Sequence, residues 1–246
     1  MTPDTPATEP ETASADDLRK LISPVRYVLW DLDGPICQLF AGYSAPKIAN
    51  RLVSSLEQDK QLELLPMAER LRKDPHAMLA GIGQRHPDTD QVVKLEEWLT
   101  GEELKAVGSA RDTPHAEDVI RAWAGLGVQL AVSTNNSARA ATAYLAAKGL
   151  DGFFPHVYGR TRDLHLMKPD PHSLLLALDA MDAEPSEALM LGDAPTDYEA
   201  ARTAGIPFLG YACDLPKVRA FRRAGVEPSR MVPSLKEVWD VLRSQG

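Results

Sequence analysis

The chain has 246 residues, of which 44% are hydrophobic and 25% are charged, and its formal net charge is −8. This length suits one large α/β domain, or a core domain that carries a smaller inserted one. The acidic balance, without a dense run of Lys and Arg, predicts no nucleic-acid partner. No apolar stretch approaches the roughly 20 residues of a membrane span, so no membrane partner is expected either.

The amino-terminal segment is rich in Thr, Pro, Ala and acidic residues, and it lacks the basic start and apolar middle of a signal peptide. We therefore predict that residues 1–24 form a disordered tail. The chain has only two cysteines, Cys37 and Cys213, which are too few for a disulfide framework. These features together predict a cytoplasmic protein.

The first predicted strand lies within residues 27–34 and ends in two acids and a glycine. Its apolar run is typical of a parallel strand that is covered on both faces. Asp31 and Asp33 are two residues apart, and in an extended chain this spacing points both side chains the same way. Like charges at close range cost free energy unless a cation lies between them. The pattern therefore indicates either a cation site or a turn with solvated aspartates.

Residues 46–107 show helical spacing of apolar residues and no β-rich segment, so we predict a helical cap over residues 36–109. Because the cap follows the first strand directly, it is expected to lie over the carboxyl ends of the sheet, where ligands bind in open α/β folds. We expect it to set specificity and to add little to the stability of the core. Five cap residues are candidates to bind a second anionic group of a substrate: Lys47, Arg51, Arg70, Arg72 and Arg85.

From Thr113 onward, predicted helices and strands alternate regularly. Helices are predicted at residues 115–126, 138–148, 171–181, 198–204 and 234–243, and strands at 128–133, 157–158, 188–191 and 207–209. This alternation predicts the α/β class, with a Rossmann-like parallel sheet and helices on both faces. The catalytic core then comprises residues 25–35 and 110–246.

Polar residues follow three more of these elements. Thr134 and Asn135 end the second strand, in a cluster that suits anion contacts but also an N-cap. Lys168 precedes a rigid Pro-Asp-Pro and, taken alone, resembles a surface lysine. Asp193 and Asp197 flank the turn after a third strand, where Asp197 could simply cap a helix. Gathered at one sheet edge, these groups could hold Mg²⁺ and neutralise a phosphoryl group.

The four motifs resemble the haloacid-dehalogenase superfamily of phosphohydrolases, in the branch with a helical cap and in its phosphoglycolate-phosphatase-like group. The resemblance covers about residues 26–209. It implies that Asp31 is the nucleophile and Asp33 the general acid and base. It also implies that Asp31, Asp33 and Asp193 bind Mg²⁺, with Asp197 supporting the metal and the lysine. Three residues are implied to bind the phosphoryl group: Thr134, Asn135 and Lys168.

The resemblance implies an enzyme, a Mg²⁺-dependent phosphatase that hydrolyses a small phosphorylated metabolite through an aspartyl-phosphate. A phosphosugar mutase on the same scaffold stays open, as does a non-catalytic binding protein that retains the fold. One departure from the family pattern is Pro35, which stands where Thr or Val is usual after the Asp-Gly pair. Proline there either stiffens the turn or removes a hydrogen bond.

Three other activities fit the sequence less well. A dehalogenase on this fold needs neither a metal nor Asp33, Asp193 and Asp197. Cys213 and Arg219 have the spacing of a cysteine phosphatase, but the segment between them has no glycine to cradle a phosphate. The six histidines show no spacing typical of a zinc site.

Overall fold

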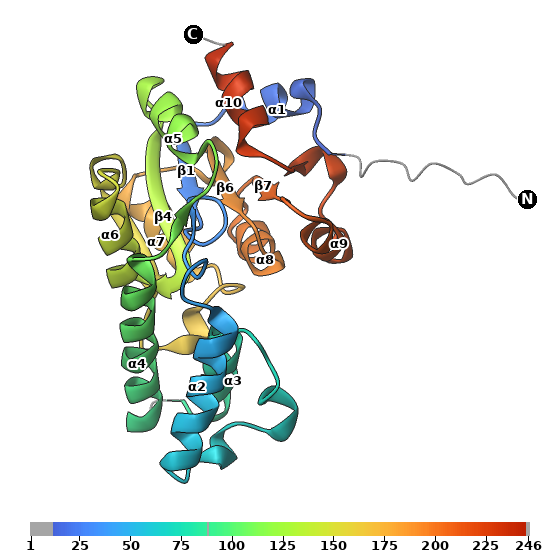
Figure 1. Cartoon of the computed structure of the whole chain (residues 1–246). Helices are drawn as coiled ribbons and strands as arrows, with labels where there is room; N and C mark the ends of the chain where they lie inside the picture. Colours follow the sequence, from blue (N-terminus) through green and yellow to red (C-terminus); the bar gives the residue numbers. More distant parts are fainter. Residues whose placement is uncertain (1–11, 88, 245–246) are drawn as a thin grey trace, which may run out of the picture.

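The structure is a computed structural model that describes residues 12–87 and 89–244 (Figure 1). Its centre is a six-stranded sheet with the strand order β5-β4-β1-β6-β7-β8, in which all neighbouring strands are parallel. The strands are β1 (Tyr27–Trp30), β4 (Gln129–Ser137), β5 (His156–Arg160), β6 (Ala188–Gly192), β7 (Phe208–Tyr211) and β8 (Met231–Val232). The predicted Rossmann-like α/β fold is confirmed.

Helices cover both faces of this sheet. Val28 and Trp30 of β1 pack into one hydrophobic cluster, whereas Leu29 between them packs into the other, as the alternation of a strand requires. The first face is covered by α1 (Ala15–Ile22), α5 (Ala116–Gly125), α6 (Ala138–Ala147) and α10 (Leu235–Arg243). The second face is covered by α7 (His172–Ala180), α8 (Pro195–Ala204) and α9 (Leu215–Ala224). Burial on both sides explains the continuous apolar sequence of the central strands.

The prediction of a disordered tail at residues 1–24 is wrong for the part of it that the structure describes. The side chain of Ser14 caps α1, and Asp17 completes the capping box from the first turn. Leu18 and Ile22 are buried against the core, and the Ala13 N–H donates to the Met231 carbonyl at 2.9 Å. Sequence reasoning missed this short amphipathic helix because its acid-rich composition is also typical of disordered segments. Residues 1–11 lie outside the described residues.

The segment between β1 and α5 forms the cap. Its helices are α2 (Ala45–Gln58), α3 (Pro75–Arg85) and α4 (Asp90–Val107), with two short 3-10 helices at Leu62–Leu64 and Met67–Glu69. Two short strands, β2 (Cys37–Gln38) and β3 (Arg111–Asp112), pair antiparallel and bring the two connections together. Figure 1 shows α2 and α3 extending away from the sheet, whereas α4 runs back toward α6. No helix within the described ranges is long and apolar enough to cross a membrane.

Cap and core share a hydrophobic cluster and a buried ionic junction. Leu164 and Met167, from the loop after β5, are part of the hydrophobic cluster of the cap. Glu103 of α4 pairs with Arg160 of β5 at 2.8 Å, and both side chains are fully buried. The same carboxylate accepts a hydrogen bond from the Ser137 N–H at 2.9 Å. The cap is therefore joined to the core more firmly than two flexible connections would allow.

We expect Glu103→Gln to lower the free energy of unfolding by about 3 kcal/mol. The substitution leaves the buried Arg160 guanidinium without its main counter-charge, and breaking a buried pair in this way costs roughly 3–5 kcal/mol. The matched control is Glu97→Gln on the same helix. Glu97 also reaches the core, where it pairs with Arg139 at 2.7 Å, but both side chains are more than half exposed. That change should cost about 1 kcal/mol or less. Urea unfolding measures both variants, and equal losses would contradict the role given to the buried pair.

Candidate active site

The first two site residues lie on the turn that follows β1. Asp31 continues the strand, because its N–H donates to the Leu191 carbonyl at 2.9 Å. The carboxylate of Asp33 accepts the Leu39 N–H at 2.8 Å, which fixes its orientation. Burial raises the pKa of Asp33 to about 6, against that hydrogen bond, which lowers it. A carboxyl with such a pKa can exchange protons near neutral pH.

Gly34 and Pro35 shape this turn. Gly34 has a φ of +113°, and a Cβ there would lie 2.2 Å from the Asp193 carboxylate. Only glycine therefore permits both the turn and the close approach of Asp193. The Leu32 carbonyl accepts hydrogen bonds from the N–H groups of residues 36 and 37, so the turn does not depend on an N–H at residue 35. Pro35 is accordingly compatible with the motif.

Lys168 is buried at the centre of the site. Its ammonium lies 3.0 Å from Asp31 Oδ1 and 2.6 Å from Asp197 Oδ1, and it donates to the Ser133 carbonyl at 2.7 Å. Burial opposes the charge, but the Asp197 and Asp31 carboxylates outweigh it and raise the pKa of Lys168. The reading as a surface lysine is therefore wrong.

Asp193 and Asp197 occupy the turn between β6 and α8. Asp197 is fully engaged: Oδ1 pairs with Lys168, and Oδ2 accepts the Asp193 and Ala194 N–H groups, each at 3.0 Å. Asp193 instead faces the cavity and pairs with Lys217 of α9. Burial raises the pKa of Asp193, and the Asp31 carboxylate acts in the same direction. Asp193 is thus a carboxylate that an added cation would stabilise.

Thr134 and Asn135 lie at the carboxyl end of β4. The Thr134 hydroxyl donates to Asn136 Oδ1 at 3.0 Å, and its oxygen accepts the Asn136 N–H at 3.2 Å. The Asn135 side chain makes a reciprocal pair with the backbone of Lys168: Oδ1 accepts its N–H at 2.8 Å, and Nδ2 donates to its carbonyl at 3.0 Å. Asn135 therefore positions the segment that carries Lys168. The second hydrogen of the Asn135 side-chain amide stays available to a phosphate.

One cavity of about 170 Å³ brings the predicted site residues together. All seven of them line it: Asp31, Asp33, Thr134, Asn135, Lys168, Asp193 and Asp197. A second cavity, of about 300 Å³, adjoins it beneath α3 and shares Asn135 and Lys168. The four motifs, which lie far apart in sequence, therefore form one site at the carboxyl edge of the sheet.

The donor set fits a divalent cation. Carboxylate oxygens of Asp31, Asp193 and Asp197 lie within 4.8 Å of one another. Five carboxylates line this cavity, including Asp74 of the cap, whereas only two ammonium groups, Lys168 and Lys217, pair with carboxylates there, so negative charge exceeds positive charge when all of these groups are ionised. Oxygen ligands of this kind are the ones that Mg²⁺ prefers. Because Lys168 and two backbone N–H groups already engage Asp197, Asp31 and Asp193 are the carboxylates available to the ion.

Sequence reasoning missed three functional residues. His76 of α3 lines the catalytic cavity, Asn136 holds the Thr134 hydroxyl, and Lys217 pairs with Asp193. The sequence offers little to identify these residues. Lys217, for example, lies in α9, a helix that the sequence pattern does not predict. His76 follows Asp74-Pro75, a helix start whose direction the sequence does not reveal.

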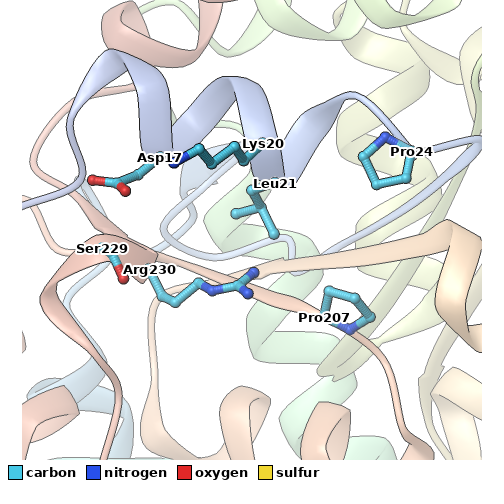
Figure 2. A pocket seen from close by; sticks show the side chains of 7 residues that line it. All are labelled: Asp17, Lys20, Leu21, Pro24, Pro207, Ser229 and Arg230. Carbon is cyan, nitrogen blue, oxygen red and sulfur yellow. The ribbon is translucent and has the colours of Figure 1, made fainter.

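A separate cavity of about 260 Å³ lies at the other end of the sheet. Figure 2 shows its lining residues, which come from α1 and from the segments around β7 and β8: Asp17, Lys20, Leu21, Pro24, Pro207, Ser229 and Arg230. Pro24 and Pro207 precede β1 and β7, which places this cavity at the amino ends of the strands. None of the predicted site residues lines it.

Comparison with known proteins agrees with this geometry. A model of the family described as haloacid dehalogenase-like hydrolase matches residues 25–205. The chain belongs to this family. A phosphoglycolate phosphatase from Rhodospirillum rubrum is 31% identical over 194 residues, which cover 73% of this chain and 76% of that protein. One from Neisseria gonorrhoeae is 25% identical over 241 residues, which cover 91% of this chain and 96% of that protein.

Solved structures show the same family fold. CbbY from Rhodobacter sphaeroides, in complex with phosphate, superposes with a TM-score of 0.63 at 21% identity. The alignment covers 87% of this chain and 96% of that chain. At this identity the likeness shows the fold alone.

We expect Gly34→Ala to impair both stability and binding of Mg²⁺. The left-handed backbone of Gly34 alone costs an alanine about 1–2 kcal/mol, and the new Cβ would also displace Asp193. Gly127→Ala is the matched control, because Gly127 has a φ of +77° with no atom within 4 Å of the added Cβ. Urea unfolding and calorimetric titration with Mg²⁺ test the pair. Only Gly34→Ala should weaken Mg²⁺ binding, by about tenfold or more, and unchanged binding would contradict the crowding argument.

Proposed function

We propose that this hydrolase is a Mg²⁺-dependent phosphatase that hydrolyses a small phosphomonoester through an aspartyl-phosphate on Asp31. The observation that carries the proposal is the position of Asp31, whose carboxylate lies 3.0 Å from the buried Lys168 ammonium. Asp193 faces the same cavity, where burial and the Asp31 carboxylate raise its pKa despite its pair with Lys217. A nucleophile, a fixed cation and a metal-binding acid are the parts that phosphoryl transfer requires.

The residues divide the reaction between them. Asp31 attacks phosphorus, while Lys168 and the Thr134 hydroxyl offset negative charge on the phosphoryl oxygens. Asp33, with its pKa raised to about 6, protonates the leaving alcohol and then accepts a proton from the attacking water. Asp31, Asp33 and Asp193 would hold Mg²⁺. When bound, the ion would further stabilise negative charge on the phosphoryl group.

The substrate class follows from the relatives and the cap. Both relatives described above are phosphoglycolate phosphatases, so 2-phosphoglycolate is the first substrate to test. Among the five candidate cap cations, Arg51 pairs with Glu102, Arg70 donates to two backbone carbonyls, and Arg85 pairs with Glu69. Arg72 lines the cavity beneath α3 and has no ion pair within the described ranges. It is the cap cation best able to meet an anionic substrate group.

Two further expectations belong to this proposal. We expect the partner to be a small phosphorylated metabolite and the protein to work in the cytoplasm, as composition and cysteine content predict. A mutase would need to return the phosphoryl group to its substrate, whereas both relatives described above are phosphatases. Hydrolysis is therefore the activity that we propose.

We expect phosphate release from 2-phosphoglycolate in the presence of Mg²⁺, and none after EDTA treatment until Mg²⁺ is restored. The reason is that the excess of carboxylates over ammonium groups at the site would otherwise repel the phosphoryl group. A colorimetric phosphate assay over a panel of phosphorylated metabolites measures this directly. Turnover that is undiminished by EDTA would contradict the metal assignment, and a full panel without turnover would contradict the proposed function.

A further inference from the structure

The cap contributes two titratable side chains, Asp74 and His76, to the cavity that contains Asp31. Asp74 caps α3 and Pro75 occupies its first turn, so the helix begins at the site. His76, in that first turn, lines the catalytic cavity together with Asp31 and Asp33. It also lines the adjoining cavity beneath α3. His76 therefore stands at the boundary between the phosphoryl site and the space available to the rest of a substrate.

The imidazole of His76 is held by a buried chain of charges. Its Nε2 lies 2.6 Å from Glu103 Oε1, and Asn136 Nδ2 lies 3.4 Å from the same nitrogen. The Phe40 ring packs against the imidazole, with 5.8 Å between ring centroids. Glu103 is in turn paired with Arg160, and burial would raise its pKa, but Arg160 and His76 lower it well below its usual range. The ring is thus oriented by an anion that stays ionised.

This arrangement leaves the second ring nitrogen free. Nδ1 has no hydrogen-bond partner in the described parts of the chain, since the nearest carboxylate, that of Asp74, is 3.9 Å away. A histidine that is fixed through one nitrogen presents the other to a ligand in a defined position. Packing between cap and core already has the Glu103–Arg160 pair and the hydrophobic cluster that contains Leu164 and Met167. The position of His76 between the two cavities and its free Nδ1 therefore suit a contact with a bound substrate.

We propose that His76 hydrogen-bonds an oxygen-bearing group on the leaving group of the substrate, and that Glu103 and Arg160 hold His76 in place for this contact. The proposal rests on the phosphatase function proposed above. Lys168 and Thr134 occupy the phosphoryl end of the cavity, so a bound ester must direct its leaving group past the cap side. His76 is then a specificity-determining residue, and Glu103 is a positioning residue.

The test compares three phosphate esters that differ only at the end of the leaving group: 2-phosphoglycolate, 2-hydroxyethyl phosphate and ethyl phosphate. They present a carboxylate, a hydroxyl and a methyl group. The wild-type protein should favour at least one of the two polar esters over ethyl phosphate. His76→Ala should lower kcat/KM for the favoured ester by about 10- to 100-fold, the range of a hydrogen bond involving a charged group. Its effect on ethyl phosphate should be less than about threefold.

Matched variants separate recognition from general damage. His86→Ala removes a histidine at the other end of α3 that lines neither cavity, and it should change none of the three rates. Glu103→Gln should lower the preference for the polar ester, and adding it to His76→Ala should cause no further loss of preference. Glu96→Gln also weakens the surroundings of Arg160, which Glu96 contacts at 3.2 Å, but no contact joins Glu96 to His76 within the described residues. It should leave the preference unchanged.

The outcomes distinguish this proposal from the function beneath it. Equal losses on all three esters in His76→Ala, or no loss, would overturn the assignment of His76. So would a wild-type protein that hydrolyses the esters without preference, although its phosphatase activity would then stand. Failure to hydrolyse any ester with Mg²⁺ would overturn the phosphatase function itself. Urea unfolding of each variant confirms that the compared proteins are folded.

Discussion

The site depends on keeping four carboxylates close together in a partly buried place. Lys168 makes this possible, because one ammonium reaches both Asp31 and Asp197 and also the Ser133 carbonyl. Its own position is fixed by Asn135, which pairs with its backbone on both sides. Asp197 in turn fixes the turn that carries Asp193. The ends of three strands and one loop are thus tied into a single arrangement, whose remaining negative charge makes a divalent cation favourable.

The connection between cap and core also depends on a buried carboxylate that is paired with a cation. Glu103 lies fully buried, where an unpaired carboxylate would be costly, and Arg160 compensates it from the core side. The pair also anchors the Ser137 N–H, next to the polar residues at the end of β4. The cap helix α4 is therefore fixed near the phosphoryl site, and the histidine oriented by Glu103 comes from a different cap helix, α3.

The parallel sheet and the convergence of the four motifs could be predicted because both rest on local signals. Apolar strands ending in acids or hydroxyls are visible in sequence, and the carboxyl ends of parallel strands meet at one edge. The helix α1 was missed because its acidic residues, which cap it, are also typical of disordered segments. Lys217 and the Glu103–Arg160 pair were missed for another reason. Each joins elements that are far apart in the chain, and only the packed fold shows that Lys217 lies beside Asp193 and that Glu103 and Arg160 are buried together.

The central claim is that Asp31 carries the phosphoryl group during turnover. Rapid quenching of the reacting protein, followed by borohydride reduction, converts an aspartyl-phosphate to homoserine, which peptide mass spectrometry can locate. Asp33→Asn should slow both the formation and the hydrolysis of this intermediate, because the general acid and base is lost, so turnover should fall by about 10²–10⁴ while the intermediate still forms on Asp31. We predict homoserine at position 31 in both proteins and at no other position, with none in Asp31→Asn. Release of phosphate without modification at Asp31, or modification of a different carboxylate, would contradict the account.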